Sequence, residues 1–246
     1  MTDEPFPRTR NVALLIDADN ASPDSLDPVL NVLAELGTVN IRRAYGNWQK
    51  TALGGWAKII HRHAIEPQQQ FDLTKGKSAT DMKMIIDAMD LLYSGHVHGF
   101  GLMSSDSDFM PLAMRIRQDG LPVYGFGTAK TPESFQNACT RFIDVAALKI
   151  ANAETGAGDG DPGGVSKAVR PVDEELIKLI GHAWKSAKRD ERGFASLQEV
   201  GKLAGNRSSF DARSYGFSRL ADLIKAIPNF EIEKRDGGAA FVKRVR

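Results

Sequence analysis

The chain has 246 residues, of which 26% are charged and 42% hydrophobic, as in an ordinary globular protein. No stretch approaches the roughly 20 apolar residues of a membrane span, and residues 1–10 lack the apolar core of a signal peptide. The single cysteine, Cys139, excludes an internal disulfide and a cysteine-based metal site. We therefore expect a cytoplasmic protein that has no membrane partner.

The small net charge of +1 hides an asymmetry along the chain. Residues 1–150 carry 15 Lys and Arg against 17 Asp and Glu, whereas residues 167–246 carry 17 against 11. An acidic part followed by a basic part is expected when one part performs chemistry and the other holds a polyanion. A modestly basic end is more often only a solvated surface, so charge alone does not decide.

In residues 10–150, predicted strands alternate with predicted helices. The apolar run at residues 11–17 shows no alternation and is typical of a strand buried on both faces. Further strands are predicted at residues 39–45, 64–68, 97–105 and 121–127. Helices are predicted at residues 23–36, 51–63, 81–94, 111–118 and 132–148. This order indicates an α/β domain with a parallel sheet that has helices on both faces.

Two further regions follow. Residues 151–167 are acidic, rich in glycine and almost free of large apolar side chains, which is typical of a flexible linker. Residues 168–246 contain three helical patterns, at 172–188, 194–205 and 214–226. Two alternating stretches around Asp236-Gly237-Gly238 then predict a β-hairpin. The region is therefore predicted to form a small winged helix-turn-helix domain.

Acidic residues follow two of the predicted strands and open one helix. Asp17 ends the first strand, Asp106 and Asp108 follow the strand at 97–105, and Asp81 opens the helix at 81–94. Ligands of an open parallel sheet collect at the carboxyl ends of its strands, so we expect these carboxylates to lie together. Asp87 lies about 240° further round the helix than Asp81, which favours a supporting role.

Crowded carboxylates repel one another and have raised pKa values, a cost that a hard divalent cation removes. Mg²⁺ or Mn²⁺ in such a site can polarise a phosphate and lower the pKa of a bound water. Single Asp residues are more often turn or cap residues, but Asp17, Asp106 and Asp108 stand together at strand ends. The sequence therefore predicts a metal site for phosphate chemistry.

Several neighbouring residues suit a phosphate substrate. Lys77 lies in the loop before Asp81, and Ser105 supplies a hydroxyl donor, as do Ser104 and Ser107. Trp48 beside Lys50 offers a ring for base stacking next to a positive charge. A core position for Trp48 is equally expected.

Three segments in this order resemble the NYN domains, specifically the LabA-like branch of the PIN-like ribonuclease folds. They are LLIDADN, KGKSATDMKMIIDAMDLL and LMSSDSDFMPLAMRIRQDGLPVYGFG, and they span nearly all of residues 11–148. The resemblance implies a Rossmann-like parallel-sheet sandwich and a metal-dependent endoribonuclease that leaves 5′-phosphate ends. It assigns the acidic site to Asp17, Asp81, Asp106 and Asp108, with Asn20 as an additional polar member.

Residues 170–246 resemble an OST-HTH, or LOTUS, domain, through GFASLQEVGKLAG, YGFSRLADLIKAIPNFEI and AAFVKRV. This resemblance implies RNA as a partner, or contact with another protein. Lys202, Arg207 and Arg213 are candidates for phosphate contacts, although each is equally explained as solvated surface.

Two other functions fit the same residues. The chain could be an RNA-binding or scaffold protein whose nuclease domain is inactive. It could also be a phosphatase of the haloacid dehalogenase type, in which Asp17 attacks phosphorus and Asp19 acts as acid and base. The second alternative is disfavoured because Asn20 and Ala21 follow the DxD pair, where that class usually carries Thr or Val.

Overall fold

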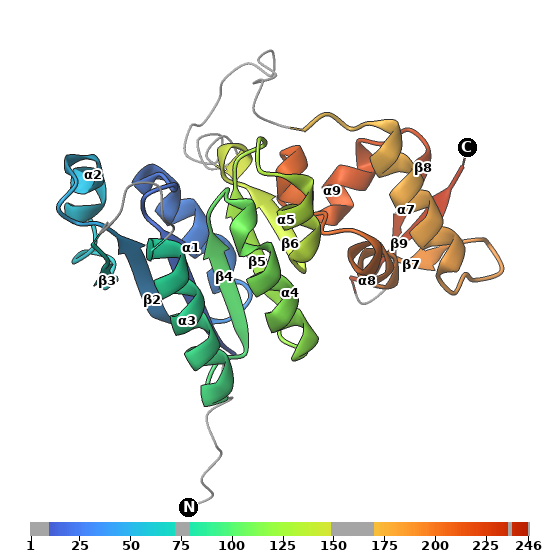
Figure 1. The fold of residues 1–246 in the computed structure, drawn as a ribbon. Coiled ribbons are helices and arrows are strands. Elements are labelled where there is room, and N and C mark those ends of the chain that lie inside the picture. The colour runs from blue at the N-terminus through green and yellow to red at the C-terminus, as the bar shows by residue number, and fades with distance from the viewer. Residues whose placement is uncertain (1–9, 72–78, 149–169, 236–237, 246) are drawn as a thin grey trace, which may run out of the picture. The chain divides into compact units, whose positions relative to one another are not determined.

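The computed structural model describes residues 10–71, 79–148, 170–235 and 238–245 (Figure 1). The chain forms two compact units that divide between Cys139 and Thr140. The predicted linker, residues 151–167, and both predicted domain boundaries lie outside the described residues. No helix in the described part of the chain is long and apolar enough to cross a membrane.

A six-stranded sheet organises the first part of the chain. Its strands are β1 (Asn11–Asp17), β2 (Thr38–Gly46), β3 (Glu66–Gln69), β4 (Gly99–Met103), β5 (Val123–Gly127) and β6 (Arg141–Asp144). They follow the order β3-β2-β1-β4-β5-β6, and the pairings from β3 to β5 are all parallel. β4 and β5 are buried along their whole length, as are residues 12–17 of β1. The predicted α/β class and the strand buried on both faces are confirmed.

Helices connect these strands. They are α1 (Leu26–Ala34), α2 (Gly54–Ala57), α3 (Ala79–Ser94), α4 (Met110–Gln118) and α5 (Glu133–Ala138), and short 3₁₀ turns at Pro23–Ser25, Thr51–Leu53 and Ser107–Phe109 lead into α1, α2 and α4. Figure 1 shows α3 and α4 side by side across the sheet, where α3 contacts β1 and β2 and α4 contacts β5. The segments that follow the strands therefore begin at the carboxyl ends of those strands.

The predicted helix at residues 132–148 is wrong. The structure has α5, then strand β6, and only residues 145–148 are helical again. α5 ends because Cys139 adopts an extended backbone, with φ −75° and ψ 154°. β6 is buried at Phe142, Ile143 and Asp144, and Asp144 accepts a hydrogen bond from the Ala146 amide at 2.8 Å. Sheet pairing and burial of an aromatic and a β-branched residue outweigh the helical periodicity here.

Two other predicted helices are shorter than expected. The helix at 51–63 is reduced to a 3₁₀ turn and the four residues of α2, which begin with the weak helix formers Gly54 and Gly55. The helix at 214–226 is interrupted at Gly216, whose φ of +80° ends the 3₁₀ turn Ala212–Tyr215. α9 (Leu220–Lys225) then begins after a break.

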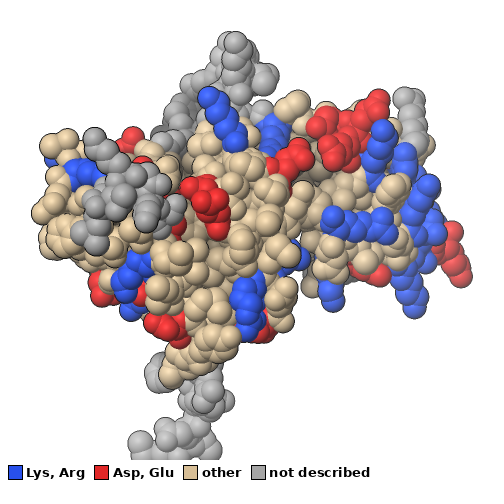
Figure 2. Space-filling view, viewed as in Figure 1, with Lys and Arg blue, Asp and Glu red and all other residues tan. Residues whose placement is uncertain are grey.

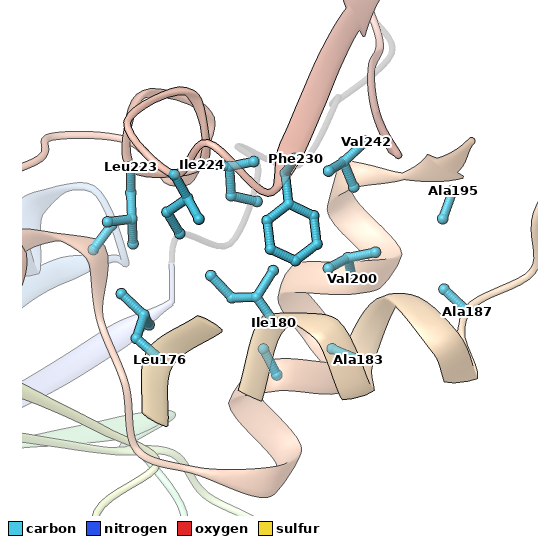
Figure 3. Packing of buried hydrophobic residues seen from close by; sticks show 13 residues of the cluster. Leu176, Ile180, Ala183, Ala187, Ala195, Val200, Leu223, Ile224, Phe230 and Val242 are labelled. Atoms are coloured by element: carbon cyan, nitrogen blue, oxygen red, sulfur yellow. The ribbon is translucent and has the colours of Figure 1, made fainter. Parts of the chain in front are cut away.

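Within residues 170–235 and 238–245, the second unit is built on three α-helices and a small antiparallel sheet. The remaining helices are α7 (Glu174–Ser186) and α8 (Leu197–Arg207), and the sheet order is β7-β9-β8, with β7 (Ala195–Ser196), β8 (Phe230–Lys234) and β9 (Ala240–Arg244). Figure 3 shows the core, in which Ile180 of α7, Val200 of α8 and Phe230 of β8 pack together. The predicted winged helix-turn-helix and its hairpin are confirmed, with turn residues 236–237 outside the described part.

A buried ion cluster fastens α3 to β2 in the first unit. The Asp87 carboxylate, 7% exposed, lies 2.5 Å from Lys83 Nζ and 3.5 Å from an Arg43 guanidinium nitrogen. The Tyr45 hydroxyl donates a hydrogen bond to Asp87 at 3.2 Å. Burial, together with the charge of Asp87, raises the pKa of Tyr45 and keeps its phenol protonated. Asp87 therefore supports the packing of α3, as its place on the helix led us to expect.

Replacing Asp87 with asparagine should destabilise the protein by about 2 kcal/mol, because two cations and a phenol lose a buried charged acceptor. The measurement is urea unfolding followed by circular dichroism. Asp90→Asn, at an exposed acid of the same helix, is the matched control and should change stability by no more than about 0.5 kcal/mol. Equal unfolding midpoints for the two variants would contradict the role given to Asp87.

Candidate active site

Asp17 is a buried carboxylate at the carboxyl end of the central strand β1. The residue is 1% exposed. Its Oδ2 accepts hydrogen bonds from the Ser104 hydroxyl at 2.7 Å and from the Asn20 amide at 2.9 Å. Its Oδ1 is buried and has no hydrogen-bond partner among the described residues. Burial raises the pKa of Asp17, although the hydrogen bonds from Asn20 and Ser104 oppose this shift.

Ser104 links the ends of β1 and β4. The pairing of Ile16 with Met103 places the next residues of both strands, Asp17 and Ser104, side by side. The Ser104 hydroxyl donates to Asp17 and accepts a hydrogen bond from the Asp106 amide at 3.1 Å. The loop that carries Asp106 is therefore held at the edge of the sheet where Asp17 lies.

Asp106 in turn organises the start of the following helix. Its Oδ1 accepts a hydrogen bond from the Asp108 amide at 2.9 Å and caps the 3₁₀ turn Ser107–Phe109. The Asp106 residue is partly exposed, and Asp108 is exposed. Both acids stand on the surface of this loop, where a ligand can reach them.

A second link joins the loop after β1 to the first turn of α3. Asp19 Oδ1 lies 3.2 Å from Lys50 Nζ, and its Oδ2 accepts a hydrogen bond from the Thr80 hydroxyl at 3.4 Å. Thr80 directly precedes Asp81, which is partly exposed at the start of α3. These contacts bring Asp81 to the same edge of the sheet as Asp17.

The other predicted substrate residues of this unit lie in different places. The Trp48 ring N–H donates to the Gln68 carbonyl at 3.1 Å, and the half-buried ring is thereby fixed against β3. The Ser105 hydroxyl accepts from the Thr128 amide at 3.0 Å and holds the loop after β5. Lys77 lies outside the described residues.

The three basic residues predicted in the second unit differ in their contacts and exposure. The Arg213 guanidinium, 13% exposed, lies 3.3 Å from the buried carboxylate of Asp211 and so holds an internal charge. The Arg207 guanidinium donates to the Ser186 hydroxyl at 2.9 Å, which connects α8 to the end of α7. Lys202 is exposed on α8.

The chemistry of the acidic edge fits a hard divalent cation. Asp17 offers a buried oxygen that no described residue contacts by a hydrogen bond, and a cation would offset the cost of burying its charge. In the part of the chain that the structure describes, no three His, Cys, Asp or Glu side chains form a group that could hold a metal. Mg²⁺ is commonly held by one or two carboxylates, with water and substrate phosphate as its other ligands. The residues present fit that mode, and the four-carboxylate ligand set stays a prediction.

Sequence reasoning missed the two links that organise this edge. Ser104 was expected only as one of three hydroxyl donors, and Asp19 had no partner assigned. The position of Ser104 directly after a strand, level with Asp17, is the signal for the first link. Nothing in the local sequence indicates that Lys50 and Thr80 meet at Asp19.

Comparison with known proteins agrees with this architecture. The family model of the NYN domain matches residues 11–148, and the model of the OST-HTH/LOTUS domain matches residues 167–242. NYN domains belong to the PIN-like nuclease superfamily, and OST-HTH/LOTUS domains bind RNA. Both resemblances drawn from the sequence are confirmed.

Two individual proteins are also similar. An uncharacterized protein of Methanocaldococcus jannaschii is 27% identical over 128 residues, which are 48% of this chain and 50% of the relative. The chain thus spans about half the length of that relative. A crystal structure of a protein of unknown function from Vibrio parahaemolyticus shares 17% identity at a TM-score of 0.46, over 58% of this chain and 96% of that one. By the family match over more than half of its residues, the chain belongs to the NYN domain family and carries an OST-HTH/LOTUS domain after it.

Proposed function

We propose that the chain is a metal-dependent endoribonuclease, in which the NYN domain hydrolyses RNA phosphodiesters and the OST-HTH/LOTUS domain holds the RNA. The observation that carries the proposal is the Asp17 carboxylate, buried at the carboxyl edge of the sheet with Oδ1 unpartnered among the described residues. An NYN domain of the PIN-like nuclease superfamily supports the reaction class, and the RNA-binding domain supports the substrate.

The residues around Asp17 have distinct roles in this proposal. Ser104 and Asn20 occupy Oδ2 and leave Oδ1 to bind the ion. Asp106 is proposed as the second carboxylate, and Asp81 and Asp108 as residues that bind the ion or its waters. When bound, Mg²⁺ or Mn²⁺ supplies charge neutralisation and a water of lowered pKa. In this proposal water attacks phosphorus in line with the P–O3′ bond, which breaks and releases the 3′ oxygen as a hydroxyl. The products then carry 5′-phosphate and 3′-hydroxyl ends, as the family resemblance implies.

In one alternative function, the chain binds RNA but does not cleave it. An RNA-binding scaffold without catalysis is favoured by the lack of a three-ligand acidic group among the described residues. The phosphatase alternative finds less support, because Asp19 is engaged by Lys50 and Thr80 and Asp17 is buried.

Replacing Asp17 with asparagine should lower the rate of RNA cleavage in Mn²⁺ by about 100- to 1,000-fold, because the buried ligand charge is lost while the side-chain shape is kept. The measurement is cleavage of an end-labelled single-stranded RNA resolved on a sequencing gel. Asp24→Asn, at an exposed acid of the neighbouring turn, is the control and should cleave at the wild-type rate.

Equal cleavage by wild type and Asp17→Asn would assign the activity to a contaminant and contradict the proposal. No cleavage by the wild type on any RNA would favour the scaffold alternative. Products that end in a 2′,3′-cyclic phosphate would contradict water as the nucleophile, since that product needs the ribose 2′-hydroxyl.

Metal binding should also be visible as a change in stability. In EDTA at neutral pH, Asp17→Asn should melt at a higher temperature than wild type, because the variant no longer buries a charge whose pKa the fold raises. Millimolar Mg²⁺ or Mn²⁺ should raise the melting temperature of wild type by about 2–4 °C and leave that of Asp17→Asn unchanged. Scanning calorimetry of both proteins checks this, and an equal metal response in the two would refute Asp17 as a ligand.

A further inference from the structure

The second unit contains an open groove between the end of α7 and β9. Its volume is about 470 Å³. The lining residues come from the end of α7, the loop that follows it, and β9: Trp184, Ala187, Arg189, Asp190, Glu191, Gly193, Lys243 and Arg244. We call this the wing groove. It lies within one compact unit, and it includes none of the basic residues that the sequence singled out.

Cations lie over the Trp184 ring in this groove and over two phenylalanine rings beside it. The Arg189 guanidinium lies 4.7 Å from the centroid of the Trp184 ring, and Lys243 Nζ lies 5.6 Å from that of Phe194. The indole N–H of Trp184 is buried without a hydrogen-bond partner among the described residues, so packing and Arg189 place this ring. Arg235 continues the row, 4.1 Å from the Phe241 ring.

Some of the arginines and lysines in and beside the groove form ion pairs with acidic residues, and others do not. Arg192 lies 2.6 Å from Glu233, and Arg235 lies 2.5 Å from Asp190. A backbone hydrogen bond from Phe194 and the Arg235 guanidinium lower the pKa of Asp190. Neither Arg189 nor Lys243 forms an ion pair with any described residue, although Glu191 also lines the groove. Their charges are therefore available to an anionic ligand.

A third cation, Arg244, lines the groove and lies against α7. The guanidinium of Arg244 lies across Gly181 of α7, where an added Cβ would approach its Nη1 to 2.7 Å. Gly181 thus lets the Arg244 side chain lie flat against the helix. In Figure 2, Lys and Arg side chains gather over this unit.

We propose that the wing groove binds single-stranded RNA, with Arg189, Lys243 and Arg244 contacting successive phosphates and a base stacking at the Trp184–Arg189 pair. A positive groove with aromatic rings is how proteins bind single strands, and arginine planes also stack on unpaired bases. An acidic peptide would use the cations but not the rings. The identity of the ligand rests on the proposed function, since RNA is what the NYN domain would cut.

The test measures binding of a fluorescein-labelled, unstructured 12-nucleotide RNA to the full chain by fluorescence anisotropy in EDTA, where no cleavage occurs. The double variant Arg189→Ala/Lys243→Ala should bind at least 10-fold more weakly. Its affinity should also fall less steeply with salt, by a slope difference of about 1.4, since two phosphate contacts are lost. Circular dichroism melting confirms that each variant is folded.

The matched control is Lys178→Ala/Lys225→Ala, which removes the same charge from exposed positions of α7 and α9 outside the groove. It should bind RNA within about twofold of wild type. An equal loss in both double variants would overturn the inference, because general charge and not the groove would then bind RNA. Unchanged binding by the groove variant would overturn it as well, as would competition by poly-glutamate as effective as that by unlabelled RNA.

Binding by the groove variant and cleavage by the wild type test the groove and the nuclease activity independently. Loss of binding in the groove variant, together with a wild type that does not cleave RNA in Mn²⁺, supports the groove and refutes the nuclease. Cleavage by wild type, together with unchanged binding by the groove variant, refutes the groove and supports the nuclease.

Discussion

The burial of one carboxylate at the end of the central strand is the constraint on which the candidate site depends. Asp17 is fixed because β1 pairs with β2 on one side and β4 on the other. A charge in this position costs stability unless it is hydrogen-bonded or bound by a cation. Ser104 and Asn20 satisfy one oxygen and the described protein leaves the other unsatisfied, which is the arrangement expected of a ligand site rather than of a structural ion pair.

The neighbouring contacts make sense as consequences of that position. Ser104 carries a hydrogen-bond chain from Asp17 to the Asp106 loop. Asp19 separately joins the loop after β1 to α3 through Thr80. Further along α3, the Asp87 cluster fastens the helix to β2. The same helix therefore has a charged anchor in its middle and a candidate ligand, Asp81, at its start. Because both lie on one helix, we expect the packing of α3 to affect the position of Asp81.

Much of the fold was predictable because local patterns and tertiary structure agree. The unbroken apolar run of β1 corresponds to burial of that strand on both faces, and the turn residues at 236–238 correspond to the antiparallel pairing of β8 and β9. The helix predicted at 132–148 failed because its apolar spacing also suits a short buried strand, and only sheet pairing decides between the two. Gly216 interrupts the helix predicted at 214–226 because its φ is positive, and the spacing of apolar residues in the sequence does not indicate such a conformation.

The candidate site was likewise predictable only in part. Strand ends located Asp17 and Asp106, because the carboxyl edge of a parallel sheet follows from strand order alone. The links through Ser104, Lys50 and Thr80 depend on strand register and loop paths, which the sequence does not state. In the second unit, the basic sequence pointed to Arg213 as a phosphate contact. The structure instead places its guanidinium in an ion pair with the buried carboxylate of Asp211. Arg189 and Lys243 of the wing groove differ from Arg213 because neither forms an ion pair with a described residue, which a count of basic residues does not reveal.

Anomalous diffraction from crystals soaked in Mn²⁺ tests the central claim most directly. We predict an anomalous peak about 2.1 Å from Asp17 Oδ1, with water completing the coordination, and no such peak in crystals of Asp17→Asn. A peak that persists in the variant, or occupied manganese sites elsewhere with none at Asp17, would show that Asp17 does not bind the ion.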